Sequence, residues 1–297
     1  MKTILIAGGT GFIGRRIQKL LEKSNFKVTI LSRSPKASNE FYWNPTKGEI
    51  DKKALENVST IINLCGASIG DKRWTNLRKE ELYKSRIEPT KFLFGLVDDL
   101  PDLESYISAS GITCYGFEDN QKIYSEKDPF GSDYLSQLVE SWENAADLFK
   151  SRCRVVKMRT AVVLDEKEGA LSKIAKPIQF GIGSALGDGK QIMSWIHIDD
   201  LTNAFLFAIQ HPIEGAFNIV GGNHSNQDFS KSLANVLNKP FFFPKVPSFI
   251  LNFILGEMAV IVLKGVNVSN EKLIDSGFEF KYSDLETTFK AIYSKNL

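Results

Sequence analysis

The chain has 297 residues, of which 43% are hydrophobic, and this is enough for one large core and a smaller lobe. Its 37 basic and 35 acidic residues are scattered along the sequence and leave a net charge of +2. This balance predicts no nucleic-acid partner and no polybasic membrane contact.

Three cysteines, Cys65, Cys114 and Cys153, stand beside apolar neighbours. Their spacing matches neither a metal site nor a disulfide framework. We interpret them as buried thiols of a reducing compartment, which predicts a cytoplasmic protein without a metal. The first strand begins almost at residue 1, so we expect no signal peptide.

The first 33 residues carry the strongest motif. An apolar strand at 4–7 opens into the turn GGTGFIG (8–14), a helix follows at 15–23, and a second apolar strand lies at 28–31. A strand, a glycine turn, a helix and a second strand make half of a dinucleotide-binding unit. Gly8, Gly11 and Gly14 let the backbone turn sharply and approach a pyrophosphate at the helix N-terminus.

The residues after the second strand indicate which dinucleotide binds. NAD sites usually carry an acidic residue there, whereas an arginine accommodates the 2′-phosphate of NADP. This chain has Ser32 and Arg33 at that place, with Lys36 as a further cation and no acid before Glu40. The pattern favours NADP(H), with a solvated loop charge as the alternative role of Arg33.

Further elements alternate as in a doubly wound α/β sheet. We expect strands at 59–64, 105–109, 154–164 and 215–220, and helices at 82–97, 134–149 and 201–209. Because ligands bind beyond the carboxyl ends of such strands, the loops 8–14, 32–36, 64–67, 108–116 and 159–163 should share one crevice. We expect a Rossmann-type cofactor domain over 1–165, to which some later segments return, and mostly a substrate lobe with a C-terminal tail over 166–297.

The apolar segment 246–263 is the one stretch that resembles a membrane span. Pro247, Asn252, Gly256 and Glu257 interrupt it, and it is too short to cross a bilayer. Its apolar residues cover most of a helix circumference, so we expect it to pack against the body of the protein. A subunit or membrane contact is the alternative.

Several motifs in order resemble the extended short-chain dehydrogenase/reductase superfamily, and within it an atypical epimerase-like branch of uncertain activity. They are GGTGFIG (8–14), LSRSP (31–35), INLCGASIGDKRW (62–74), SRIEPTK (85–91), SASGITCYG (108–116), WENAA (142–146), MRTAVVLDEKEGAL (158–171), GDGKQIMSWIHIDDL (187–201) and LIDSGFEFKYSDLETTF (273–289). The resemblance covers essentially the whole chain. It implies a Rossmann fold that binds NADP(H) and a small C-terminal lobe that closes over a substrate.

The resemblance also implies roles for individual residues. Those implied to contact the cofactor are Gly8, Thr10, Gly11, Phe12 and Ile13 at the pyrophosphate, Ser32 and Arg33 at the 2′-phosphate, Leu64 and Cys65 beneath the adenine-side ribose, Glu81 and Arg86 on a helix at that side, and Val163 near the nicotinamide. A helix-surface salt bridge is the alternative for Glu81 and Arg86, although residues five apart do not stack on a helix.

Enzymes of this superfamily use a tyrosine and a lysine four residues later on one helix face. The ammonium lowers the pKa of the phenol, which exchanges a proton with the substrate. Here Tyr134 is present, but Leu138 replaces the lysine, while Lys127 and Lys150 lie outside the required turn. We expect Tyr134 to donate a proton to a carbonyl more readily than to act as a base. The alternative is an aromatic side chain that packs beside the cofactor.

The superfamily also places a serine or threonine near the tyrosine. Ser110 is our candidate, with Ser108 and Thr113 as competitors, and all three lie at one strand end. A hydroxyl that caps the following turn is the alternative role of each.

Two other features carry competing interpretations. His197 stands in an alternating apolar stretch before Asp199 and Asp200, which we expect to cap the next helix, so a structural histidine is favoured over a general base. The loop Lys72-Arg73-Trp74 offers two cations and an aromatic ring, which suit an anionic or ring-bearing substrate. Equally, it is a hinge whose Trp74 anchors it to the core.

The sequence therefore predicts an NADP(H)-dependent oxidoreductase or epimerase-type enzyme that acts on a small polar carbonyl or alcohol. The predicted substrates include nucleotide-sugar-like molecules. Its rival is an NADP(H)-binding protein with little turnover that acts as a sensor or assembly partner. The sequence leaves a homo-oligomer open.

Overall fold

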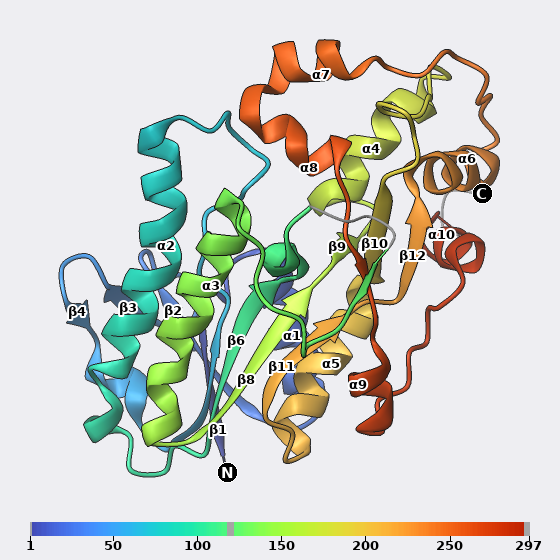
Figure 1. Ribbon diagram of the computed structural model, residues 1–297. Coiled ribbons are helices and arrows are strands. Elements are labelled where there is room, and N and C mark those ends of the chain that lie inside the picture. Colours follow the sequence, from blue (N-terminus) through green and yellow to red (C-terminus); the bar gives the residue numbers. More distant parts are fainter. Residues whose placement is uncertain (1, 118–121, 294–297) are drawn as a thin grey trace.

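The computed structural model describes residues 2–117 and 122–293 of the chain. Its centre is an eight-stranded sheet of order β11-β8-β6-β5-β1-β2-β3-β4 (Figure 1). Neighbouring strands are parallel except at the β3–β4 pair. The strands are β1 (Thr3–Ala7), β2 (Lys27–Ser32), β3 (Glu40–Asn44), β4 (Glu49–Ile50), β5 (Val58–Asn63), β6 (Ser105–Gly111), β8 (Arg154–Thr160) and β11 (Gly215–Ile219). The sheet confirms the expected Rossmann-type fold.

Helices cover both faces of this sheet, as expected of a doubly wound fold (Figure 1). On one face lie α1 (Phe12–Lys23) and α5 (Ile198–Gln210), and on the other α2 (Asn76–Phe94) and α3 (Tyr134–Ala146). Alternate residues of β1 supply the two cores: Ile4 and Ile6 join the cluster of α1 and α5, whereas Leu5 and Ala7 join the other. The period of two along a strand sends neighbouring side chains to opposite faces.

A smaller lobe is built on a second sheet, of order β12-β10-β9. Its strands are β9 (Val162–Leu164), β10 (Ile192–His197) and β12 (Gly222–Ser225), and it packs against α4 (Gly169–Gln179), α6 (Asn226–Val236) and α10 (Leu285–Tyr293). The remaining elements are β7 (Ile123–Tyr124) paired with β13 (Asn267–Val268), α7 (Ser248–Leu255), α8 (Val260–Leu263), α9 (Glu271–Asp275), and short 3-10 turns at Lys52–Leu55, Val97–Asp99, Ile112–Tyr115, Asp147–Ser151 and Gly256–Ala259.

Three expectations about elements were wrong. The strand expected at 154–164 is two strands, because β8 ends at Thr160 and β9 pairs with β10 in the other sheet. The helix expected from 82 starts at Asn76, because the Thr75 hydroxyl accepts a hydrogen bond from Arg78 N and caps it. The cap of α5 is His197, whereas Asp199 and Asp200 lie inside its first turn.

The apolar segment 246–263 also differs from expectation. Among its residues only Met258 and Ala259 are buried, and α7 has no buried residue at all. Phe249 and Phe253 are 71% and 83% exposed. Packing against the body is therefore achieved by the turn after α7 and not by α7 itself. Within residues 2–117 and 122–293, no helix is long and apolar enough to cross a membrane.

Candidate functional site

The turn between β1 and α1 leaves space where larger residues would fill it. Gly8 has a φ of +80°, and a Cβ there would lie 3.0 Å from the Leu64 carbonyl carbon. A Cβ at Gly14 would lie 2.5 Å from the Gly8 carbonyl oxygen. Gly11 is the N-cap of α1 and makes no side-chain cap hydrogen bond, so no capping side chain takes up the first N–H groups of this twelve-residue helix. This cradle, which also includes Thr10, Phe12 and Ile13, fits a pyrophosphate.

The end of β2 lies beside this turn, because β1 is its neighbour in the sheet. Ser32 is buried and its hydroxyl accepts a hydrogen bond from Ser34 N at 3.2 Å, whereas Arg33 is exposed. Burial raises the pKa of the Cys65 thiol to about 12, and the charge of Arg33 acts in the opposite direction. Arg33 is thus an exposed cation at the end of β2, close enough to the end of β5 for its charge to act on Cys65.

The two residues after β5 are held by the strands. Leu64 N donates to Ala7 O at 2.9 Å, and Cys65 N donates to the Asn63 side chain at 3.0 Å. Leu64 packs partly buried against the main core, as do Phe12, Ile13 and Val163.

The segment after β9 reaches the start of α1. Arg15 pairs with Glu168, and Arg16 pairs with Asp165 at 2.6 Å. A Cβ at Gly169 would lie 3.3 Å from the Phe12 ring. These contacts bring the segment that follows Val163 and β9 to the same end of the sheet as the glycine turn.

Glu81 and Arg86 lie in different environments on α2. Arg86 is buried and donates to Leu82 O at 2.9 Å and to Ala67 O at 3.0 Å. Burial lowers the pKa of Arg86 to about 10. Glu81 is half exposed and pairs with Arg78 at 2.7 Å, so the ion pair of Glu81 is made with Arg78 and not with Arg86.

Tyr134 is the first residue of α3 and lies against α2. Its hydroxyl donates to Lys79 O at 3.3 Å, and the Lys79 ammonium sits 4.9 Å from the ring centre. Trp74 packs edge-to-face on the same ring at 5.3 Å. Burial raises the pKa of the Tyr134 phenol, while the charges of Arg86 and Arg78 oppose that shift.

Leu138, which stands where the superfamily has its lysine, is uncharged. Leu138 is buried among Trp74, Leu82, Leu135 and Met258. It therefore belongs to the apolar contact between α2, α3 and the C-terminal lobe. The cations near Tyr134 come from α2 instead.

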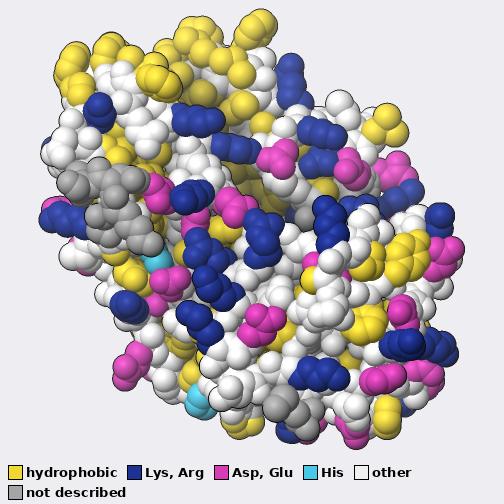
Figure 2. Space-filling model, turned by 180° about the vertical axis from the view of Figure 1, so that it is seen from behind, with side chains coloured by type: hydrophobic (Ala, Val, Ile, Leu, Met, Phe, Trp, Pro, Cys, Tyr) yellow, Lys and Arg dark blue, Asp and Glu magenta, His cyan; other side chains and the backbone are white. Residues whose placement is uncertain are grey.

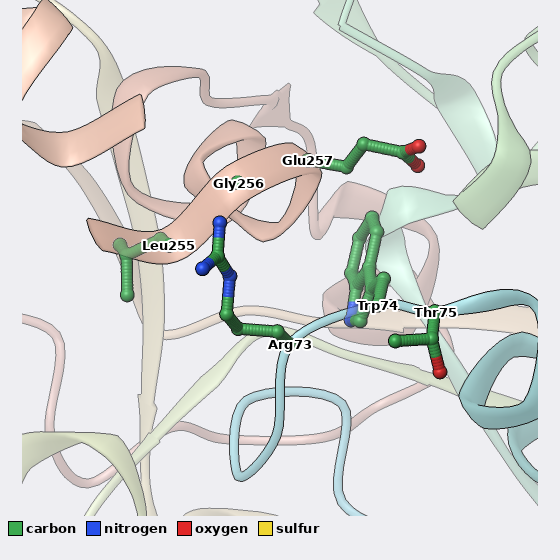
Figure 3. Close-up of a pocket in the computed structure, with 6 residues that line it drawn as sticks. All are labelled: Arg73, Trp74, Thr75, Leu255, Gly256 and Glu257. Carbon is green, nitrogen blue, oxygen red and sulfur yellow. The ribbon is translucent and has the colours of Figure 1, made fainter. Parts of the chain in front are cut away.

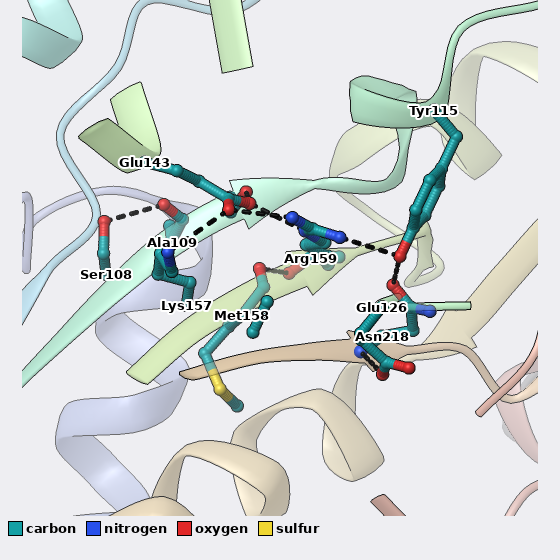
Figure 4. A network of polar contacts seen from close by, with 12 residues as sticks. Ser108, Ala109, Tyr115, Glu126, Glu143, Lys157, Met158, Arg159 and Asn218 are labelled. Carbon is teal, nitrogen blue, oxygen red and sulfur yellow. Dashed lines mark hydrogen bonds and ion pairs between the residues drawn. The ribbon is translucent and has the colours of Figure 1, made fainter. Parts of the chain in front are cut away.

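Ser110 belongs to a buried polar network between α3 and the strands. Its hydroxyl donates to Glu143 Oε1 at 2.6 Å. Glu143 accepts two hydrogen bonds from Arg159, at 2.8 and 2.9 Å, and Arg159 also donates to the Tyr115 hydroxyl at 2.9 Å (Figure 4). Tyr115 in turn donates to Asn218 Oδ1 at 2.7 Å (Figure 4). The Ser110 hydroxyl therefore donates its proton to the Glu143 carboxylate and has no second proton to donate to a substrate.

The competing hydroxyls differ in their availability. Ser108 is buried and donates to Ala109 O at 2.9 Å (Figure 4). Thr113 is half-buried, and its hydroxyl makes no hydrogen bond to any residue within 2–117 and 122–293. Its backbone carbonyl accepts from Ser136, in the first turn of α3. Of the three candidates, Thr113 has the free hydroxyl.

A pocket of about 430 Å³ opens between the loop before α2 and the end of α7 (Figure 3), and its wall residue Trp74 packs on the Tyr134 ring. It is lined by Arg73, Trp74, Thr75, Leu255, Gly256 and Glu257. Trp74 is 9% exposed and its indole N–H donates to Ile69 O at 3.0 Å. The indole also packs with Leu82 and Leu138, so it anchors the loop to the core, and it forms a wall of the pocket. The Glu257 carboxylate pairs with Lys79 at the same place.

His197 is structural, as expected. It is buried, its ring lies 3.8 Å from that of Tyr282, and its Nδ1 accepts from Asp199 N at 3.1 Å. The imidazole is therefore used by the fold, through its contact with the Tyr282 ring and the hydrogen bond that caps α5.

Comparison with known proteins identifies the family. A sequence profile of the NAD dependent epimerase/dehydratase family matches residues 4–220. The chain belongs to this family. Epimerase family members are similar to it over nearly their whole length: protein SAR0825 of Staphylococcus aureus is 36% identical, covering 99% of this chain and all of the relative. Protein ML0860 of Mycobacterium leprae is 33% identical, covering 95% of this chain and 92% of the relative.

Solved structures of epimerase family proteins share the fold. The crystal structure of human epimerase family protein SDR39U1 with NADPH superimposes with a TM-score of 0.90 at 28% identity, covering 99% of this chain and 100% of that one. UDP-glucose 4-epimerase of Thermotoga maritima, solved with UDP-glucose, gives 0.78 at 17% identity and 99% coverage of both chains, which shows the fold. Residues 246–292 match a domain of unknown function, DUF1731. This epimerase family protein is thus of the NAD(P)-dependent, extended short-chain dehydrogenase/reductase type.

Sequence reasoning missed the charged residues that surround the candidate site. Arg78 and Lys79 lie next to Tyr134 in space but precede it by more than 50 positions. Glu143 was visible as a carboxylate inside the apolar stripe of a helix, beside Trp142 and Ala146. A buried carboxylate requires a cation, and the pattern alone did not identify Arg159 as that partner. Within the described ranges, no group of three or more His, Cys, Asp or Glu residues is placed to hold a metal.

Proposed function

We propose that this epimerase family protein is an NADP(H)-dependent oxidoreductase or epimerase-type enzyme that acts on a small polar carbonyl or alcohol. The observation that carries the proposal is the uncapped glycine cradle at α1 beside an exposed Arg33. The NADPH in the structure of human SDR39U1 supports this cofactor. The Thermotoga maritima enzyme was solved with UDP-glucose, and this supports nucleotide sugars as a possible substrate class in our proposal.

The cofactor would be held by backbone and by charge. The N–H groups at the start of α1 would bind the pyrophosphate, and Ser32 and Arg33 would bind a 2′-phosphate. No acidic residue stands between positions 32 and 39, so no carboxylate from this stretch would repel that phosphate. Leu64, Cys65, Glu81, Arg86 and Val163 remain the proposed contacts along the rest of the dinucleotide. When bound, nicotinamide supplies the hydride chemistry.

Tyr134 is the proposed proton donor. Because burial raises its pKa, the phenol stays protonated at neutral pH and can give a proton to a substrate oxygen. Arg86 and Arg78 lower the cost of forming the phenolate, and they would take the electrostatic role that Leu138 lacks. This arrangement favours the reduction of a carbonyl over the oxidation of an alcohol.

A hydroxyl would orient the substrate oxygen. Ser110 is the predicted residue and can still accept a hydrogen bond, although its proton is held by Glu143. The Thr113 hydroxyl has no hydrogen-bond partner among the described residues, so it could both donate and accept, and Thr113 is our second candidate for this role.

The rival proposal is an NADP(H)-binding protein with little or no turnover. The apolar burial of Leu138 supports it, because the catalytic ammonium is replaced by core packing. We further propose a cytoplasmic protein with a cofactor domain over 1–165 and a substrate lobe over most of 166–297.

The cofactor is tested by titration with NADPH and NADH, followed by nicotinamide fluorescence. We expect tight binding of NADPH, weaker binding of NADH, and loss of that preference in Arg33→Ala. Arg152→Ala is the control, because this arginine precedes β8 and lies at the opposite edge of the sheet. Equal binding of both dinucleotides by the wild type would contradict the role of Arg33.

Catalysis is tested by NADPH oxidation with a panel of small carbonyl compounds. Tyr134→Phe should lose roughly 10²–10⁴-fold in rate, the usual contribution of general acid catalysis. The control Tyr83→Phe, which changes a tyrosine on α2 that is 44% exposed, should keep the wild-type rate. A wild type that binds NADPH and reduces none of the compounds would favour the rival. An unchanged rate in Tyr134→Phe would refute the proton-donor role.

A further inference from the structure

The C-terminal lobe carries an apolar surface that none of the residues 2–117 and 122–293 covers. It is formed by Phe180, Phe242, Phe243, Phe249, Phe253 and Ile254, which we call the α7 patch, and these side chains are 42–83% exposed. Figure 2 shows hydrophobic side chains gathered along the upper edge of the molecule, where α7 lies in Figure 1. The function proposed above does not use this surface.

Three segments of the chain are tied together to form the patch. Val246 N donates to Ala185 O, and Gly187 N donates to Val246 O, both at 2.9 Å. A Cβ at Gly181 would lie 3.8 Å from Pro240. The loop after α4 and the loop before α7 therefore run side by side, and their exposed rings share one surface with α7.

The α7 helix contributes a continuous apolar face. Phe249 and Phe253 are four residues apart, as are Ile250 and Ile254, so both pairs stack along the helix. The next turn is fixed to the body, since Met258 is buried beside Trp74 and Leu138. The protein thus anchors one end of this segment and presents the other outward.

The area of the patch is large for a protein without a partner. With aromatic side chains of about 150–250 Å² each, its exposed surface amounts to roughly 800 Å². The largest apolar patch of a typical monomer is about 300–600 Å². Two copies joined across a two-fold axis would bury roughly 1,600 Å² in total, the area of a standard specific interface.

We infer that the α7 patch is the interface of a symmetric homodimer. The charge pattern favours a second copy over a lipid bilayer. Helices that lie on bilayers carry Lys or Arg on a polar face, whereas α7 (SFILNFIL) has no charged residue. The nearby Lys245 ammonium is held by the Asp188 carbonyl at 2.6 Å. A charge-free centre with charges at its rim is the usual anatomy of a protein interface.

The dimer would also fix a wall of the candidate site. The patch continues directly into Leu255, Gly256 and Glu257, which line the pocket beside Trp74 (Figure 3). Glu257 pairs with Lys79, whose ammonium lies over the Tyr134 ring. A partner that holds α7 in place therefore holds this side of the pocket as well.

The test measures the mass of the full chain by light scattering and by sedimentation over a range of concentrations. We expect a dimer for the wild type and a monomer for Phe253→Glu, with at least a tenfold weaker association. Leu77→Glu is the matched control, because Leu77 is 79% exposed on α2, and it should remain dimeric. Circular dichroism and thermal melting should show that Phe253→Glu folds like the wild type, since the replaced ring contributes little to the core.

Three outcomes would overturn the inference. One is a wild type that is monomeric at every concentration, and another is a Phe253→Glu variant that still dimerises. The third is an open series of larger oligomers, because a two-fold contact closes at two copies. A monomer that sediments with phosphatidylglycerol vesicles, and loses this in Phe253→Glu, would assign the patch to a membrane surface instead.

Discussion

Gly14 shows how one residue decides whether the cofactor cradle can form. Alanine is the better helix former, so the exchange Gly→Ala inside a helix is ordinarily favourable. Here a Cβ would lie 2.5 Å from Gly8 O and 2.6 Å from Gly9 Cα, and both are backbone atoms. The backbone would have to move away from α1, and the turn would lose the shape that fits a pyrophosphate.

We therefore expect Gly14→Ala to lower the free energy of unfolding by about 1–3 kcal/mol, as overpacking does. It should also weaken NADPH binding. Urea denaturation and nicotinamide fluorescence measure the two effects. Gly70→Ala is the control, since no atom lies within 4 Å of a Cβ there, and its effect should stay within about 0.5 kcal/mol. Equal stability of the two variants would show that the turn tolerates a side chain.

The start of α5 shows how an element depends on the protonation of one side chain. His197 Nδ1 accepts the Asp199 N–H, which is possible only while that nitrogen carries no proton. Burial lowers the pKa of His197, although Asp199 and Asp165 act against this shift and Lys281 and Arg16 act with it. The neutral imidazole is thus the form that caps the helix.

This cap predicts a pH dependence of stability. Because the folded state has the lower pKa, the unfolded chain takes up the proton first as the pH falls through about 6.5. The free energy of unfolding should therefore decrease between about pH 7.5 and 5.5. His197→Asn keeps a capping oxygen and should show a shallower decrease, measured by urea denaturation at each pH. Burial also lowers the pKa of His224. Because His224 is present in both proteins, its contribution to the pH dependence is the same in the wild type and in the variant. Identical slopes would exclude His197 as the source.

At the scale of the whole molecule, the C-terminal tail closes the smaller lobe and ties it to α5, which packs on the eight-stranded sheet. Phe289 of α10 is fully buried and packs edge-to-face on Phe229 at 5.0 Å. Asp200 of α5 accepts the backbone N–H groups of Lys281 and Tyr282, at 3.1 and 2.8 Å. The tail is therefore part of the core and not an appendage.

Phe289→Ala should lower the free energy of unfolding by about 3–5 kcal/mol, the cost of a large cavity in a core. Leu77→Ala, at an exposed apolar position, should change it by less than about 0.5 kcal/mol. Thermal and urea unfolding of both variants would measure this. A loss below about 1 kcal/mol for Phe289→Ala would mean that the tail contributes little to cooperative folding.

The sequence by itself determined the parts that depend on neighbouring residues. The first strand, the glycine turn and α1 follow from a local pattern, and Arg33 follows directly after β2. Parallel strands bring their carboxyl ends to one edge, so the grouping of the site loops could also be predicted.

Only the tertiary structure decided which distant side chains meet. Ser110 and Thr113 both follow from the sequence as hydroxyls at the end of one strand. In the structure, Glu143 accepts from Ser110, whereas the Thr113 hydroxyl has no partner among the described residues. The cations beside Tyr134 come from another helix, and α7 is apolar in the manner of a core helix although it lies outside. Hydrophobicity predicts that a face will be covered, but only the packing of the elements shows whether the same chain covers it.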